Sequence, residues 1–141
     1  MDKYKFIDHT ADIKFKAWGE TLGSLFENSV LAIVNFMSRG EKISPKKSKV
    51  INVSGEDLES LFYNFLEEII SLIDTDKFIT SKAEVTLRGN NLKAELYGDD
   101  SKSYGLDCIK SPTYSEMYIK KVKSTEKGKE EHWEAQVVLD V

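Results

Sequence analysis

The chain has 141 residues, of which 40% are hydrophobic, so one domain with a sizeable core is expected over residues 1–141. Its 24 acidic and 20 basic residues give a formal net charge of -4, which argues against direct binding of nucleic acid. Cys108 is the only cysteine, which excludes an internal disulfide and predicts a reducing, cytoplasmic location. The longest apolar stretch, at residues 58–73, is interrupted by charged and amide side chains, so no membrane-spanning segment is expected.

The first half of the chain predicts two strands and two helices. Residues 12–18 alternate between polar and apolar side chains, as a half-buried strand does. From Thr21, a suitable helix N-cap, apolar residues recur every three or four positions as far as residue 37. A short strand at 49–53 precedes a second amphipathic helix over 58–73, and the acidic residues before that helix suit its N-terminal dipole.

The second half of the chain predicts two hairpins. Residues 82–88 and 92–97 flank a turn rich in glycine and asparagine, and both flanks hold alternating or β-branched residues. A second hairpin joins 116–123 to 132–140, whose side chains alternate between apolar and polar. Two further segments are predicted to be irregular: residues 98–104 and 110–113. The order of elements predicts an α+β fold, with a mostly antiparallel sheet packed against two amphipathic helices.

One acidic segment near the start of the chain is a candidate metal site. Asp8 and Asp12 bracket His9 just before the first predicted strand. A hard divalent cation needs several oxygen ligands, so two carboxylates require help from elsewhere in the chain. Asp140 and the terminal carboxylate of Val141 could give that help if the last strand lies beside the strand that starts at Asp12. Both aspartates belong to the polar phase of their strands.

A purely structural role for these residues is the alternative. Asp8 and Asp12 would then cap turns, His9 would bond a nearby carbonyl, and Asp140 would be a solvated strand end. The residues alone leave both interpretations open. Elsewhere the chain has no glycine-rich phosphate loop and no ordered Ser/His/Asp set, so no catalytic or cofactor-binding residue is predicted.

Several motifs together resemble the archease family. The run Phe6-Ile7-Asp8-His9-Thr10-Ala11-Asp12-Ile13 and the following Gly19-Glu20 are similar to the start of that family. The other similar segments are Val53 to Leu61, Phe65 to Glu68, Tyr97-Gly98, Lys110 with Thr113-Tyr114, and Val137 to Val141. One position departs from the pattern, because Ser115 stands where the family tends to have histidine. The resemblance covers essentially the whole chain.

This resemblance implies a non-catalytic protein that activates the RNA-splicing ligase RtcB. That ligase joins tRNA halves and other RNA ends with GTP and a divalent metal, and archease promotes its guanylylation and turnover. In this sequence the resemblance assigns metal binding to Asp12 and Asp140, followed by His9 and the terminal carboxylate of Val141. Calcium is the first expectation for the metal, and manganese, magnesium and zinc are the alternatives.

Two other functions are also compatible with the sequence. A small metal-dependent hydrolase would use His9, Asp12 and Asp140, with His9 as the general base. A general chaperone or adaptor would instead use an exposed apolar surface. The sequence predicts no membrane partner and leaves the oligomeric state open.

Overall fold

A computed structural model describes residues 2–7, 12–123 and 131–141 of the chain. The elements are β1 (Tyr4–Ile7), β2 (Ile13–Gly19), α1 (Leu22–Ser38), β3 (Lys47–Ser54), α2 (Leu58–Thr75), β4 (Phe78–Arg88), β5 (Asn91–Asp100), a 3-10 turn (Ser101–Ser103), β6 (Ser111–Val122) and β7 (His132–Asp140). Neither helix in these described ranges is long and apolar enough to cross a membrane.

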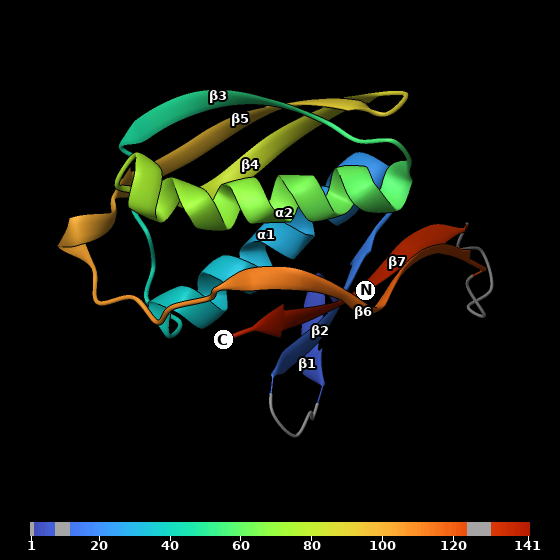
Figure 1. Ribbon diagram of the computed structural model, residues 1–141, viewed down its shortest axis with the longest axis horizontal. Helices are drawn as coiled ribbons and strands as arrows, with labels where there is room; N and C mark the ends of the chain where they lie inside the picture. Colours follow the sequence, from blue (N-terminus) through green and yellow to red (C-terminus); the bar gives the residue numbers. More distant parts are fainter. Residues whose placement is uncertain (1, 8–11, 124–130) are drawn as a thin grey trace.

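The strands form two antiparallel sheets, and both helices lie between them (Figure 1). One sheet has the order β1-β2-β7-β6 and the other has the order β3-β5-β4. Helix α1 contacts β4 on one side and β2 on the other, while α2 contacts β3 and β4 on one side and β6 on the other. The predicted α+β class is therefore confirmed, and the structure adds that the strands divide into two sheets. Each helix buries a wide apolar surface because it is covered from both sides.

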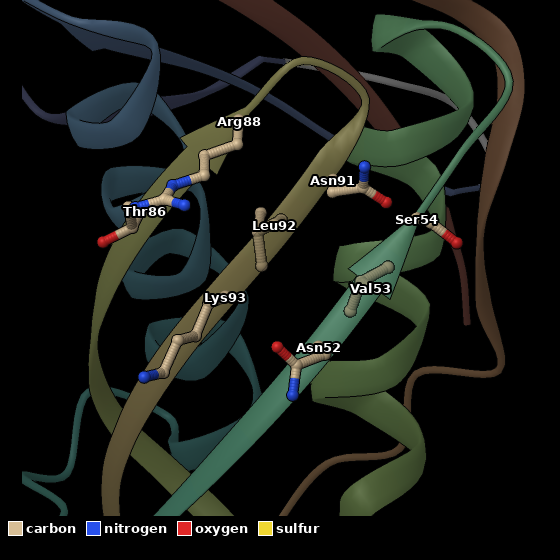
Figure 2. A pocket seen from close by; sticks show the side chains of 8 residues that line it. All are labelled: Asn52, Val53, Ser54, Thr86, Arg88, Asn91, Leu92 and Lys93. Atoms are coloured by element: carbon tan, nitrogen blue, oxygen red, sulfur yellow. The ribbon is translucent and has the colours of Figure 1, made fainter.

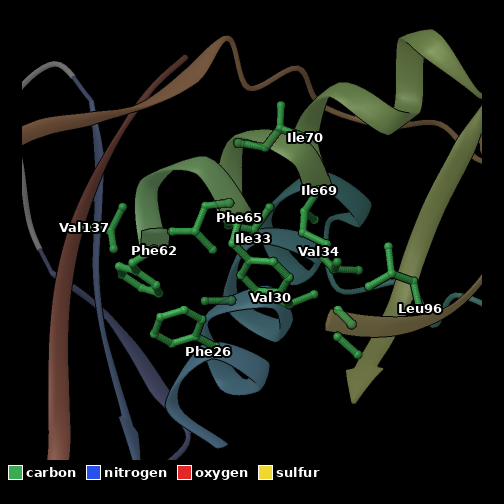
Figure 3. Close-up of a cluster of buried hydrophobic side chains, with 14 of the residues drawn as sticks. Phe26, Val30, Ile33, Val34, Phe62, Phe65, Ile69, Ile70, Leu96 and Val137 are labelled. Carbon is green, nitrogen blue, oxygen red and sulfur yellow. The ribbon is translucent and has the colours of Figure 1, made fainter. Parts of the chain in front are cut away.

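The main core lies where the two helices meet the sheets (Figure 3). The Phe26 ring of α1 packs against two rings of α2, with centroids 4.8 Å from Phe62 and 5.8 Å from Phe65. Leu96 of β5 and Val137 of β7 belong to the same buried cluster, and all five side chains are fully buried. The same core thus anchors strands from both sheets.

Both helices begin at the residues that the sequence predicts. The side chain of Thr21 accepts a hydrogen bond from the Ser24 amide at 3.0 Å, and Asp57 accepts one from the Ser60 amide at 2.7 Å. In each case the serine side chain reaches back to the cap residue, which completes a capping box. Helix α1 ends at Arg39, whose φ of 55° is left-handed.

Several strands differ from the prediction; β4, for example, begins at Phe78 and not at residue 82. Strand β1 was not predicted, because four residues are too short for a clear alternation. Residues 98–100 were predicted to be irregular, but they extend β5 and pair with β4. Gly98 fits there because a side chain at this position would clash with the Ile79 carbonyl oxygen of β4. Residues 111–113 belong to β6. Pro112 is tolerated there because β6 is an edge strand, where a missing amide donor breaks no central ladder.

Glu134 connects three strands of the β1-β2-β7-β6 sheet. Its carboxylate accepts hydrogen bonds from the Trp18 indole at 2.8 Å and from the Tyr118 hydroxyl at 2.5 Å, and Lys120 lies 3.6 Å away. Burial raises the pKa of Glu134, but these donors and the positive charge of Lys120 outweigh it, and the pKa lies below its ordinary value. The folded protein therefore favours the ionised carboxylate.

Glu134→Gln is expected to destabilise the fold at neutral pH by about 1–2 kcal/mol, because a charged acceptor is replaced by a neutral amide. Since folding lowers the pKa, the charge contributes stability above the unfolded-state pKa, and this contribution is lost as the pH falls through the folded-state value. Urea unfolding at neutral pH and below about pH 4 measures it. The deficit should shrink in acid. A loss of stability that does not change with pH would contradict this explanation. The matched control is Glu84→Gln, because Glu84 is exposed on a sheet face.

Candidate functional site

The two predicted aspartates are brought together by the pairing of β2 with β7. Ile13 pairs with Leu139 in an antiparallel register, and continuing that register by one step places Asp12 opposite Asp140. Figure 1 shows the two strands side by side, although one comes near the start of the chain and the other near its end. The predicted adjacency of these strands is confirmed. Directly opposite residues in such a pair have Cβ atoms about 5 Å apart.

The end of β7 is held by its other neighbour. Ser111 of β6 pairs with Asp140, and the Lys110 amide donates a hydrogen bond to the Asp140 carbonyl oxygen at 2.8 Å. Val141 follows directly and is 40% exposed. The backbone of Asp140 is therefore held by the β6 side of the sheet. Asp8 and His9, the other predicted members of this site, lie outside the described residues.

An open hollow of about 590 Å³ lies beside Asp12. Its lining consists of Phe6, Ile7, Asp12, Ile13, Lys14, Asn35, Phe36, Arg39, Gly40 and Asp107. Within this lining, Arg39 donates to one oxygen of Asp107 from Nε at 2.9 Å and from Nη2 at 2.6 Å. This hydrogen bonding lowers the pKa of Asp107, so that carboxylate is ionised and already paired. The sequence did not predict this pair, whose partners are 68 positions apart.

The strand ends at Asp12 and Asp140 offer carboxylate oxygens as metal ligands. Within residues 2–7, 12–123 and 131–141, no group of three or more His, Cys, Asp and Glu side chains could hold a metal ion. The side chains of Asp12 and Asp140 contribute oxygen atoms only. Oxygen donors suit hard cations such as calcium and magnesium, whereas zinc favours nitrogen and sulfur. These residues fit a calcium ion better than a zinc ion.

A second hollow, of about 630 Å³, lies on the β3-β5-β4 sheet (Figure 2). It is lined by Asn52, Val53, Ser54, Thr86, Arg88, Asn91, Leu92 and Lys93. The lining includes two cationic side chains and no carboxylate or imidazole, so it offers no acid–base pair and no set of metal ligands. None of the predicted site residues lies here. We therefore place the candidate site at Asp12 and Asp140.

Comparisons with known proteins agree on one family. A sequence profile of the Archease protein family matches residues 4–141. Protein archease of Pyrococcus abyssi is 34% identical over 148 residues, covering 100% of both chains. Protein archease of Methanosarcina barkeri is 36% identical over 147 residues, covering 99% of this chain and 96% of the relative. The solution structure of Methanobacterium thermoautotrophicum protein 1598 superimposes with a TM-score of 0.76 at 27% identity, covering 100% of both chains.

Proposed function

The chain belongs to the archease family, and from this premise we propose that it is a non-catalytic activator of the RNA-splicing ligase RtcB. It would act in the cytoplasm, in tRNA splicing and RNA end joining. The ligase would hold the catalytic residues, and this chain would promote its GTP-dependent guanylylation and turnover. The observation that carries the proposal is the pairing that sets Asp12 opposite Asp140 at one end of the sheet.

The working part of the activator would be the acidic tip formed by Asp12, Asp140 and the main-chain carboxylate of Val141, with His9 as a further candidate ligand. Asp12 directly precedes β2 and Asp140 ends β7, so strand pairing orders the backbone near both residues before a ligand binds. A bound calcium ion, with manganese, magnesium or zinc as alternatives, would supply positive charge beside the triphosphate of the ligase. The aspartates would hold and orient that charge.

Pairing the purified chain with the ligase from the same cell tests this function. We expect more covalently guanylylated ligase per unit time when the chain is present with GTP and metal, and a complex that co-purifies. The matched control replaces the chain by the same amount of an unrelated acidic protein. Unchanged guanylylation by an active ligase would contradict the proposal. Turnover of a phosphate ester by the chain alone would instead support the hydrolase alternative.

A further inference from the structure

Two tyrosines form a stacked pair on the surface between α2 and β6. The rings of Tyr63 and Tyr114 are nearly parallel, with an interplanar angle of 8° and centroids 4.3 Å apart. Tyr63 of α2 is half-buried, whereas Tyr114 of β6 is 54% exposed. One ring face of Tyr114 is thus covered by Tyr63, and much of the remaining ring meets solvent. An exposed aromatic residue of this kind is a common anchor for binding partners.

A bulge in β6 presents Tyr114 to α2. Thr113 pairs with Val138 and Tyr118 pairs with Gln136, so residues 114–117 stand opposite a single residue of β7. Glu116 within the bulge has a left-handed φ of 57°. The bulge is held in place, because Gln136 donates to the Glu116 carbonyl oxygen at 2.9 Å and Lys14 pairs with the Glu116 carboxylate at 3.2 Å. Bulges of this kind re-aim side chains.

Carboxylates surround the tyrosine pair. Burial on one side raises the pKa of Tyr114, and the negative charges of four α2-side residues raise it further: Asp57, Glu67, Glu56 and Glu59. Burial likewise raises the pKa of Tyr63, helped by the charge of Glu67 and a hydrogen bond to it. Among the ion pairs between described residues, none includes Glu56, Glu59 or Glu67. The region around Tyr114 is therefore strongly acidic.

Three other aromatic rings of the protein each have a lysine ammonium group over the ring face. Lys82 lies 5.4 Å from the Tyr97 ring centroid, Lys120 lies 4.8 Å from that of Tyr118, and Lys121 lies 5.5 Å from that of Trp133. No such lysine or arginine accompanies the stacked pair among the residues that the structure describes. An aromatic face in a negative field attracts a cation by charge and by its ring quadrupole.

We propose that Tyr63, Tyr114 and the carboxylates of Glu56, Glu59 and Glu67 form a docking surface for an arginine-bearing segment of a partner protein. A guanidinium would stack on the open side of Tyr114 while its N–H groups donate to the neighbouring carboxylates. Arginine suits the site better than lysine because its group is planar and holds five donors. The carboxylates would repel RNA, so charge complementarity selects a basic peptide. This surface uses none of the proposed metal ligands.

A short peptide with three arginines, compared with its citrulline counterpart, tests the docking surface without any ligase. Citrulline keeps the planar shape and removes the charge. We expect the arginine peptide to shift the NMR signals of Tyr63 and Tyr114, and the citrulline peptide to leave them unchanged. Tyr114→Ala should weaken binding about fivefold, whereas Tyr114→Phe should retain it, since the ring provides the stacking face. Glu59→Gln should make binding of the arginine peptide less sensitive to salt, because one charge of the surface is removed.

The matched control is Tyr97→Ala. Tyr97 lies on the β3-β5-β4 sheet, and the Lys82 ammonium group already contacts its ring face. This variant should bind the arginine peptide as the unchanged chain does. Equal binding of both peptides would overturn the proposal, as would unaltered affinity of a folded Tyr114→Ala chain. Chemical-shift changes confined to acidic residues away from α2 and β6 would overturn it as well. Because Asp12 and Asp140 remain intact in every variant, failure here would leave the proposed activator function standing.

Discussion

Asp12→Asn and Asp140→Asn are each expected to abolish the stimulation of ligase guanylylation and to weaken calcium binding at least about tenfold. The amide has nearly the size of the carboxylate, so the fold should be kept while one negative ligand is removed. Because the β2–β7 register sets these residues opposite each other, neither can replace the other. Calorimetry with calcium and a guanylylation assay measure the two effects in parallel.

Asp107→Asn is the matched control for these variants. Asp107 lines the same hollow as Asp12, but Arg39 already neutralises it through two hydrogen bonds. This variant should keep both calcium binding and stimulation. If the Asp12 and Asp140 variants stimulate the ligase as well as the unchanged chain does, the working site lies elsewhere. If calcium binding is lost while stimulation persists, the bound calcium is not needed for stimulation.

Phe26→Ala is expected to cost about 3–5 kcal/mol of folding stability, which is enough to unfold many domains of this size. The ring is fully buried, and it contacts both Phe62 and Phe65 at the point where the two helices meet. Phe62 and Phe65 are themselves fully buried in α2, so they can relax only partly into the space that the ring leaves. Thermal and urea unfolding followed by circular dichroism measure the loss.

Phe6→Ala provides the comparison for this core substitution. The Phe6 side chain is 39% exposed on β1, although its ring contacts Phe15 with centroids 6.5 Å apart. Its removal should therefore cost much less than removal of Phe26. Equal losses for the two variants would show that burial between the helices is not what makes Phe26 important.

The helices and their starts were predictable because their signals are local. The cap at Thr21 and the periodic apolar residues after it lie within one stretch of chain, and the structure places the helix there. Apart from β1, the strands were predicted, but their ends were not. Residues 98–100 and 111–113 carry no clear alternation, and they become strand only because a neighbouring strand is available to pair with them.

The candidate site was predictable in part for the same reason. Polar phase and position near the ends of the chain suggested that Asp12 and Asp140 could meet, and this required only one assumption about which strands pair. The Arg39–Asp107 pair and the Tyr63–Tyr114 stack depend on tertiary packing between a helix and a distant segment. No local pattern marks such contacts, so a single sequence gives no signal for them.

The position of β7 also constrains the order in which the protein can assemble. Strand β7 is made after the other strands that the structure describes, yet it lies between β2 and β6 and joins them. During synthesis the β3-β5-β4 sheet can pair early. The β1-β2 pair and β6 cannot join into one sheet until β7 is available between them. Until β7 leaves the ribosome, the sides of α1 and α2 that face this second sheet stay incompletely covered. That interval is when a nascent chain most needs protection from aggregation.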